Sequence, residues 1–202
     1  MPMDAFGAGF ALSLSLILAI GAQNAFVLKQ GLRGEHVFWI CLFCAISDAV
    51  LILAGVAGFA VLGDVFPALL PWMRYGGAAF LIWYGARSFR AAWKGGAALV
   101  PTGEAPRRLG PVLGICAVLT WGNPHVYLDT LALIGSVSTR YGEGRYVFAS
   151  GAMLASFLFF FTLGYGAALL RPVFATVTAW RVLEAGIGVV MWFIAAGLLW
   201  EM

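Results

Sequence analysis

The sequence predicts an all-α integral membrane protein in which six transmembrane helices form two inverted-topology three-helix repeats. The first supporting observation is composition: 62% of the 202 residues are apolar, 10% are charged and the mean hydropathy is +0.94. Ordinary soluble domains contain about a quarter charged residues. A folded chain of this size also keeps much of its surface exposed, so that surface must face lipid. The other two observations are the number of apolar stretches and an internal repeat.

The apolar stretches are long enough to cross a bilayer. A transmembrane helix needs about 20 mainly apolar residues to span a hydrocarbon layer of about 30 Å. The candidate spans are residues 5–28, 37–63, 70–93, 110–137, 146–170 and 181–201. We therefore expect a first repeat over residues 1–93, a cytoplasmic linker over 94–109 and a second repeat over 110–202.

The distribution of basic residues predicts the orientation of the chain. Short cytoplasmic loops are enriched in Lys and Arg. Nine of the twelve basic residues lie at or after the ends of the first, third and fifth stretches, namely Lys29, Arg33, Arg87, Arg90, Lys94, Arg107, Arg108, Arg171 and Arg181. We therefore expect these loops in the cytoplasm and both termini outside, in the inner (plasma) membrane of a bacterium.

An internal repeat emerges when the second half of the chain is aligned with the first. The matched pairs are Ser47 with Ser156, Gly55 with Gly164 and Gly77 with Gly186 at a shift of 109 residues, and Asn24 with Asn123 at a shift of 99. Each half contains an odd number of spans, so the two halves must cross the membrane in opposite directions. Inverted repeats of this kind are typical of secondary transporters.

The first and fourth stretches contain residues that interrupt helices. They are Gly21 in the first stretch, close to the polar Gln23 and Asn24, and Gly122 and Pro124 in the fourth, on either side of Asn123. Pro cannot donate to the helical ladder, and Gly weakens helical order. Backbone groups freed at membrane depth are tolerated only beside protein or a water-filled cavity. Breaks in helices 1 and 4 therefore predict a shared polar cavity near the midplane.

Two carboxylates lie within the apolar stretches. Asp48 is eleven residues into the second stretch, about 16 Å along a helix. Asp129 follows Pro124 by five residues, on the same stretch as Tyr127 and His125. A charge at the bilayer centre costs about 2.5–3.5 kcal/mol on insertion scales, so these acids are expected to serve a cationic ligand or a transported proton. The alternatives are that Asp48 caps a local kink or pairs with a basic helix end, and that Asp129 is solvated near the outer interface.

Other chemistries have weaker support. Cys41 and Cys44 form a CxxC pair, a thiol-exchange motif, but the second half has no matching cysteine, and small-residue packing is favoured. The asparagines at the breaks could instead form interhelical hydrogen bonds, and Glu184, which begins the last stretch, is expected at the interface. The sequence contains no GxSxG, HExxH or Walker motif, so no enzyme activity, cofactor, metal site or nucleic-acid partner is expected.

Three segments are distinctive in their order and spacing. They are Gly21-Ala22-Gln23-Asn24-Ala25-Phe26-Val27-Leu28-Lys29-Gln30-Gly31, then Ser47-Asp48, then Asn123-Pro124-His125-Val126-Tyr127-Leu128-Asp129-Thr130. Over nearly the whole chain they resemble the LysE family of basic amino-acid exporters. Neutral amino-acid exporters of the wider superfamily are less similar, because they tend to carry Pro-Gly-Pro-Asn and Asn-Pro-Lys at the two breaks.

The resemblance implies export of L-arginine or L-lysine from the cytoplasm. The expected substrate-binding residues are Gln23, Asn24, Asp48, Asn123, Tyr127 and Asp129, with proton coupling by Asp48 or Asp129. Moving one positive charge outward against an inside-negative potential costs about 2.3 kcal/mol per 100 mV, and exchange for an inward proton would cancel that charge movement. We therefore expect a proton antiporter whose partners are substrate, protons, lipid and a second copy in a homodimer. A divalent-cation exporter, which needs more ligands at depth, and a neutral amino-acid exporter are the alternatives.

Overall fold

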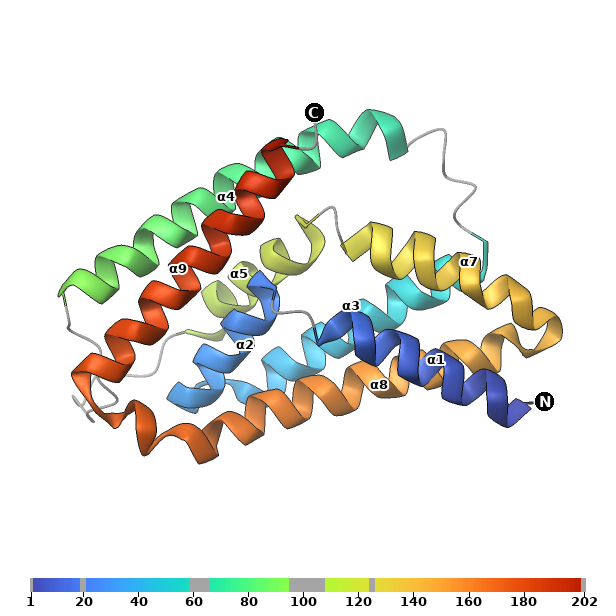
Figure 1. The fold of residues 1–202 in the computed structure, drawn as a ribbon, viewed down its shortest axis with the longest axis horizontal. Helices are drawn as coiled ribbons and strands as arrows, with labels where there is room; N and C mark the ends of the chain where they lie inside the picture. Colours follow the sequence, from blue (N-terminus) through green and yellow to red (C-terminus); the bar gives the residue numbers. More distant parts are fainter. Residues whose placement is uncertain (1, 19–20, 59–65, 95–107, 124–125, 201–202) are drawn as a thin grey trace.

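The computed structural model describes residues 2–18, 21–58, 66–94, 108–123 and 126–200 (Figure 1). Over these ranges the α-helices are α1 (Pro2–Ile17), α2 (Ala22–Arg33), α3 (Val37–Val56), α4 (Phe66–Lys94), α5 (Leu109–Trp121), α7 (Ile134–Ser138), α8 (Arg145–Gly166) and α9 (Val177–Trp200). A π-helix precedes α7, and short 3-10 helices follow α7 and α8, at Tyr127–Leu133, Thr139–Gly144, Ala167–Leu170 and Val173–Ala175. The all-α prediction is confirmed over the described residues.

Several of these helices are long and apolar enough to cross a membrane. Among the described residues they are α3, α9 and the helical run Asp129–Leu170 that contains α8. The bent pair α1 and α2 makes a fourth if it counts as one span. By itself α5 is too short, since its 13 residues rise about 20 Å. The chain is therefore a multi-pass membrane protein, whereas six spans in two inverted repeats stay a prediction.

The first predicted span consists of two helices that meet at an angle of 82°. α2 begins at Ala22, and Gly21, the residue expected at the break, is in an extended conformation directly before it. Gln23 and Asn24 therefore belong to the first turn of α2 and not to the break itself. An interrupted backbone places polar side chains and a helix N-terminus at the same point inside the molecule.

The end of α2 corrects the predicted loop. Lys29 and Arg33, both expected in a cytoplasmic loop, lie within α2. The helix ends at Gly34, whose left-handed backbone (φ 71°) lets its N–H bond the carbonyls of Gln30 and Gly31. This conformation strongly favours glycine. The helix therefore extends five residues past the predicted end of the span.

The fourth predicted span is also divided. α5 ends at Trp121, with Gly122 as its C-cap, and among the described residues helical structure is present again at Val126, directly before the π-helix that begins at Tyr127. Pro124 and His125, on which the predicted break partly depends, lie outside the described residues. π-Helical turns are rare and occur frequently at functional sites.

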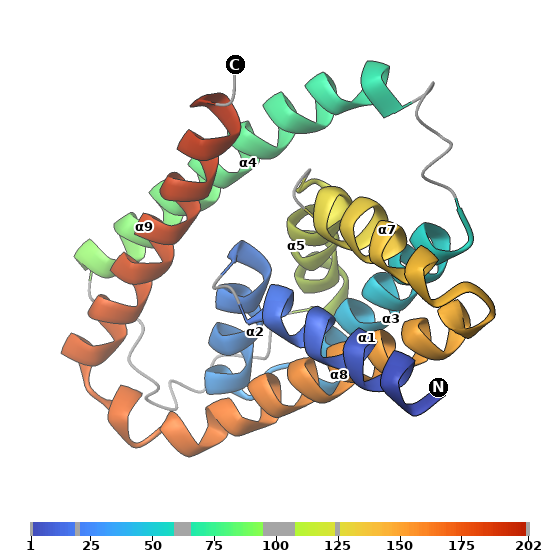
Figure 2. The same ribbon diagram turned by 45° about the vertical axis from the view of Figure 1, so that its right-hand side comes forward.

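The helices form two groups, which are connected near the C-terminal ends of α2 and α4, where Arg171 and Arg181 lie. α4 and α9 run antiparallel along one side, while α1 lies along α8 and α3 packs against α8 (Figures 1 and 2). Arg171 donates to the carbonyls of Gly31 and Leu32 at the end of α2, and Arg181 donates to those of Ala92 and Trp93 at the end of α4. Basic side chains are favourable at helix C-termini, and these bonds bring together segments predicted to share one side of the membrane.

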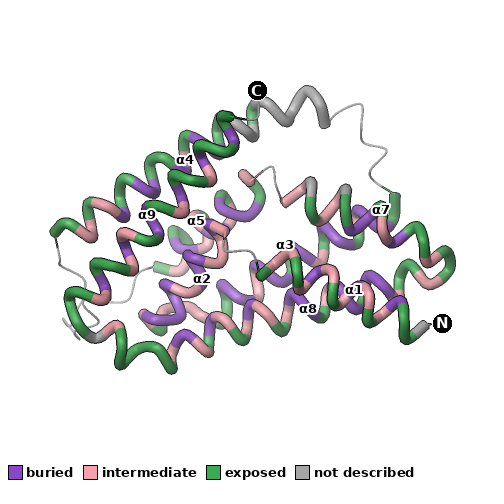
Figure 3. The backbone as a smooth tube through the Cα atoms, in the orientation of Figure 1, coloured by how far each residue is buried: buried purple, intermediate pink, exposed green. Residues whose placement is uncertain are grey.

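The outer faces of the helices expose large apolar side chains. Exposed residues recur along both α4 and α9 (Figure 3). Among them, Trp93, Phe193 and Trp200 are 86%, 79% and 89% exposed. Soluble monomers rarely show large contiguous apolar patches. These faces suit lipid, and they agree with the composition.

Glycines allow the second predicted span of each half to touch the first span of the other half. A Cβ at Gly31 in α2 would collide with the carbonyl oxygen of Gly164 in α8. A Cβ at Gly135 in α7 would lie 2.7 Å from the carbonyl oxygen of Gly55 in α3. Gly55 and Gly164 are a matched pair of the internal repeat. Gly31 and Gly135 are not matched in the same way, because a shift of 99 residues places Thr130 opposite Gly31.

Candidate functional site

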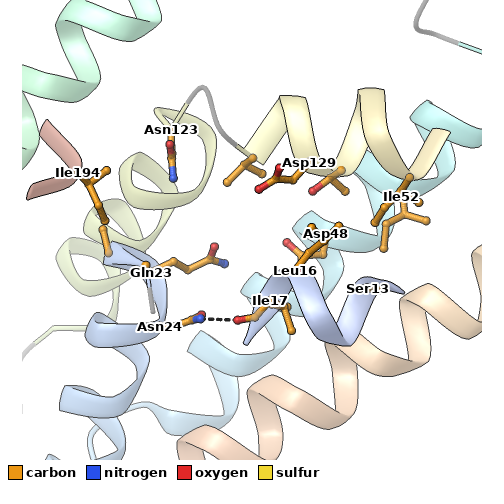
Figure 4. A pocket seen from close by; sticks show the side chains of 15 residues that line it. Ser13, Leu16, Ile17, Gln23, Asn24, Asp48, Ile52, Asn123, Asp129 and Ile194 are labelled. Atoms are coloured by element: carbon orange, nitrogen blue, oxygen red, sulfur yellow. Dashed lines mark hydrogen bonds between the residues drawn. The ribbon is translucent and has the colours of Figure 1, made fainter. Parts of the chain in front are cut away.

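A cavity of about 240 Å³ lies where the two helix breaks meet (Figure 4). We call it the central cavity; it is lined by Ser13, Leu16 and Ile17 of α1, by Gly21, Ala22, Gln23 and Asn24, by Asp48 and Ile52 of α3, by Asn123, Val126, Asp129, Thr130 and Ile134, and by Ile194 of α9. Typical ligand pockets have about 300–1,000 Å³. The central cavity is somewhat smaller than that range, as expected for a ligand the size of an amino acid.

Five of the six expected substrate-binding residues line this cavity. They are Gln23, Asn24, Asp48, Asn123 and Asp129. Three separate segments of the chain contribute them, namely the start of α2, the middle of α3 and the two sides of the second break. The sequence predicted this shared cavity from the two breaks, and the structure brings the residues together; their roles stay predictions.

Asp48 belongs to α3 and is buried, with 8% of its surface exposed. Its Oδ2 accepts a hydrogen bond of 2.6 Å from the hydroxyl of Ser156 in α8. A hydroxyl is neutral, so this contact satisfies one acceptor without cancelling the charge of an ionised carboxylate. Burial of such a group is unfavourable unless it is paired or hydrogen-bonded. Asp48 is therefore held in place by a polar contact that leaves it able to bind a cation.

Asp129 reaches the cavity from the opposite side. It lies in the first turn of the π-helix, and its carboxylate points toward the space above Asp48 (Figure 4). Its side chain is exposed, in contrast to Asp48. The cavity therefore combines one buried carboxylate with one accessible carboxylate.

The start of α2 supplies hydrogen-bond donors to the same cavity. The first N–H groups of a helix have no partner within the helix and carry a partial positive charge. The N-cap residue is Gly21, which has no side chain to accept a hydrogen bond from these N–H groups. The Gln23 amide nitrogen, Nε2, is buried and donates to no acceptor among the described residues. A helix N-terminus beside an unused amide donor is suited to a carboxylate.

Each break is bridged by one side chain that reaches a backbone carbonyl. Nδ2 of Asn24 donates to the Ile17 carbonyl at the end of α1, with a donor–acceptor distance of 2.7 Å. The Tyr127 hydroxyl donates to the Trp121 carbonyl at the end of α5, at 2.8 Å. Tyr127 is not among the residues that line the central cavity. Its contact with Trp121 joins the two halves of the fourth predicted span.

A buried ion pair lies outside the predicted set of site residues. Lys29 Nζ is 2.6 Å from Glu184 Oε1 and 2.8 Å from Oε2, and Glu184 is 1% exposed. Glu184 is therefore paired inside the protein, and its expected depth at the membrane interface stays a prediction. Both residues belong to helices, since α9 begins at Val177 and α2 extends past Lys29, and both are buried. The sequence shows an acidic residue, Glu184, in the last apolar stretch and a basic residue, Lys29, at the end of the first. It gives no further sign that the two side chains form a pair.

The thiols were expected to be ordinary packing residues. Cys44 in α3 and Cys116 in α5 are buried, and their Sγ atoms are 3.3 Å apart. Over the part of the chain that the structure describes, no group of three or more His, Cys, Asp or Glu side chains is arranged to hold a metal ion. The thiols of Cys44 and Cys116 therefore form a contact between α3 and α5.

Comparison with known proteins gives relatives over most of the chain. At 46% identity over 186 residues, covering 92% of each chain, the chain is similar to a Mycobacterium bovis protein named "Putative amino-acid transporter Mb0498". It is 42% identical to "Arginine exporter protein ArgO" of Escherichia coli K12, covering 94% of this chain and 90% of that protein. It is 41% identical to ArgO of Serratia proteamaculans, covering 96% and 95%.

No solved structure matches the chain. The family model described as "LysE type translocator" matches residues 14–202. That range includes both helix breaks, both cavity carboxylates and the Lys29–Glu184 pair. The resemblance predicted from the three segments is confirmed: the chain belongs to the LysE family of translocators.

Proposed function

We propose that this protein exports basic L-amino acids, arginine and/or lysine, from the cytoplasm across the bacterial inner membrane in exchange for protons. The observation that carries the proposal is the central cavity, in which Asp48 and Asp129 face the same space. Two carboxylates among amide donors suit a ligand with more positive than negative groups. Relatives that cover nearly the whole chain bear the name arginine exporter.

A basic amino acid complements the central cavity group by group. Its side-chain cation can pair with Asp48 or Asp129, and a guanidinium forms two parallel hydrogen bonds with a carboxylate. Its own carboxylate can accept hydrogen bonds from Gln23 Nε2 and from the first N–H groups of α2. Asn123, at the other break, supplies further amide groups.

The same carboxylates offer a route for proton coupling. An acid that pairs with substrate in one conformation and binds a proton in the next exchanges one positive charge for another. That exchange removes the cost of moving a cation outward against the membrane potential, about 2.3 kcal/mol per 100 mV. Asp48, which is buried beside Ser156, and the exposed Asp129 are the two groups proposed for this role.

We also propose that six spans form two inverted repeats around this cavity. Two similarities between the halves support the arrangement. The matched glycines Gly55 and Gly164 each lie against a glycine of the other half, and one side chain bridges each break. Alternating access would then come from movement of one half against the other around a fixed site.

The test uses the purified protein in lipid vesicles loaded with labelled arginine, lysine or leucine. We expect efflux of arginine or lysine, little efflux of leucine, and faster efflux when an imposed pH gradient drives protons inward. Asp48→Asn and Asp129→Asn should each reduce efflux at least tenfold. Glu143→Gln, an exposed acid in the turn before α8, is the matched control and should export normally. Full-rate export by both Asp variants, inserted at wild-type levels, would contradict the proposed mechanism.

A further inference from the structure

A second, smaller cavity lies farther along α2, at the C-terminal half of that helix. It has a volume of about 130 Å³ and its polar lining is formed by Lys29, Gln30, Arg33, Arg87, Ser88 and Glu184. We call it the entry chamber. Lys29 follows Asn24 by five residues, a rise of about 7.5 Å along the helix, so one helix lines both cavities. Phe26 and Tyr84 lie at the chamber, packed edge to face with ring centroids 6.3 Å apart.

The Lys29 side chain occupies a cation-binding site within this chamber. Its Nζ is 2.6 and 2.8 Å from the two carboxylate oxygens of Glu184, and it lies 5.9 Å from the centroid of the Tyr84 ring. A carboxylate beside an aromatic face is a general binding site for ammonium and guanidinium groups. The protein's own lysine therefore lies where a basic amino acid could place its side-chain cation.

The remaining polar groups complement the other end of an amino acid. Gln30 is 2% exposed, and its Oε1 accepts no hydrogen bond from the described residues. A buried acceptor without a donor is unfavourable, and an α-ammonium group would satisfy it. Arg33 and Arg87 line the same chamber, and a guanidinium binds a carboxylate through two hydrogen bonds.

We propose that the entry chamber is a second substrate site, at which a basic amino acid from the cytoplasm displaces Lys29 from Glu184 before it reaches the central cavity. This inference rests on the proposed export function. The chamber is well below the size of an ordinary ligand pocket, so substrate enters only when the Lys29 side chain moves out. One cation then replaces another, and the net charge beside Glu184 is unchanged. Lys29 acts as a tethered competitor of the substrate.

Kinetics of arginine efflux from vesicles test this competition. A tethered group competes at an effective concentration in the millimolar range, so Lys29→Met should lower the KM for arginine about tenfold. Lys29→Arg keeps the competing cation and should retain a KM within about twofold of the wild type. Glu184→Gln should raise the KM at least tenfold. An ion pair that serves only the fold predicts instead that Lys29→Met lowers the amount of inserted protein and leaves the KM of the remaining protein unchanged.

A labelling experiment on the wild-type protein avoids variants that fail to fold. An amine-reactive acetylating reagent is applied with saturating arginine, with alanine at the same concentration as the control for reagent consumed by free amines. Mass spectrometry should show severalfold more acetylation of Lys29 with arginine than with alanine. Equal labelling in a protein that exports arginine would overturn the second site and leave the proposed function standing. A wild-type protein that does not export arginine would overturn the proposed function itself.

Discussion

The hydroxyl of Ser156 in α8 donates a hydrogen bond of 2.6 Å to Oδ2 of Asp48 in α3. Ser156 is completely buried, and Asp48 lines the central cavity. In the internal repeat Ser156 corresponds to Ser47, the neighbour of Asp48. The matched serine of the second half therefore orients the buried carboxylate of the first.

Removal of this hydroxyl should affect both stability and export. In Ser156→Ala, Asp48 loses its donor, and we expect the free energy of unfolding to fall by about 1–2 kcal/mol. Arginine efflux should fall as well, because the carboxylate is no longer held in one orientation. The control is Ser150→Ala, an exposed serine of the same helix whose hydroxyl bonds the Val147 carbonyl. Denaturant titration in detergent and vesicle efflux measure the two effects; equal behaviour of the two variants would contradict this role of Ser156.

Adjacent amides at the start of α2 should give opposite results. Asn24→Ala removes the 2.7 Å bond to the Ile17 carbonyl and should lower the stability of the protein by about 1 kcal/mol. Gln23→Ala removes an amide nitrogen that has no acceptor among the described residues; it should leave stability nearly unchanged and raise the KM for arginine. Thermal unfolding and efflux kinetics separate the two effects. An unchanged KM in Gln23→Ala would show that Gln23 does not bind substrate.

The close glycine contacts predict that a Gly→Ala substitution lowers the stability of the protein at Gly55 but not at Gly186. In Gly55→Ala, the new Cβ would lie 2.6 Å from the Leu131 carbonyl oxygen and 3.0 Å from that of Thr130, so α3 must shift away from the fourth predicted span. Overpacking of this kind typically costs about 1–3 kcal/mol. Gly186→Ala in α9 is the control, because nothing lies within 4 Å of its Cβ position. Unfolding temperatures compare the two variants, and equal temperatures would refute the close contact.

The two neighbouring thiols predict an inducible crosslink between α3 and α5. Treatment with diamide should oxidise Cys44 and Cys116 to a disulfide, with two electrons and two protons passing to the diamide. Their Sγ atoms are already 3.3 Å apart, so little movement is required. Cys116→Ala should abolish the crosslink, and Cys41→Ala should retain it. Mass spectrometry without reductant detects the product, and its absence from both the wild type and Cys41→Ala would show that the helices are arranged differently.

The local chemistry of the site was accessible from the sequence. A carboxylate such as Asp48 is costly within an apolar membrane span, so its presence there indicated a functional role. Gly21 and Gly122 lie at positions where helices were expected to break. In the structure α2 begins directly after Gly21 and α5 ends directly before Gly122. Spacing along the chain does not show where a helix stops when its end lies inside the protein. For that reason α2 was predicted too short, and Lys29 was assigned to a loop.

The sequence by itself determined that this chain lies in a membrane, that it is helical and that polar groups interrupt its first and fourth stretches, because each of these depends on the local balance of apolar and polar residues. Only the tertiary structure decided which distant side chains meet. Ser156 reaches Asp48, Glu184 pairs with Lys29 and Cys116 lies beside Cys44 through the packing of helices that are far apart in the chain. Such contacts depend on the angle and rotation of each helix against its neighbours, and no local pattern of residues specifies those.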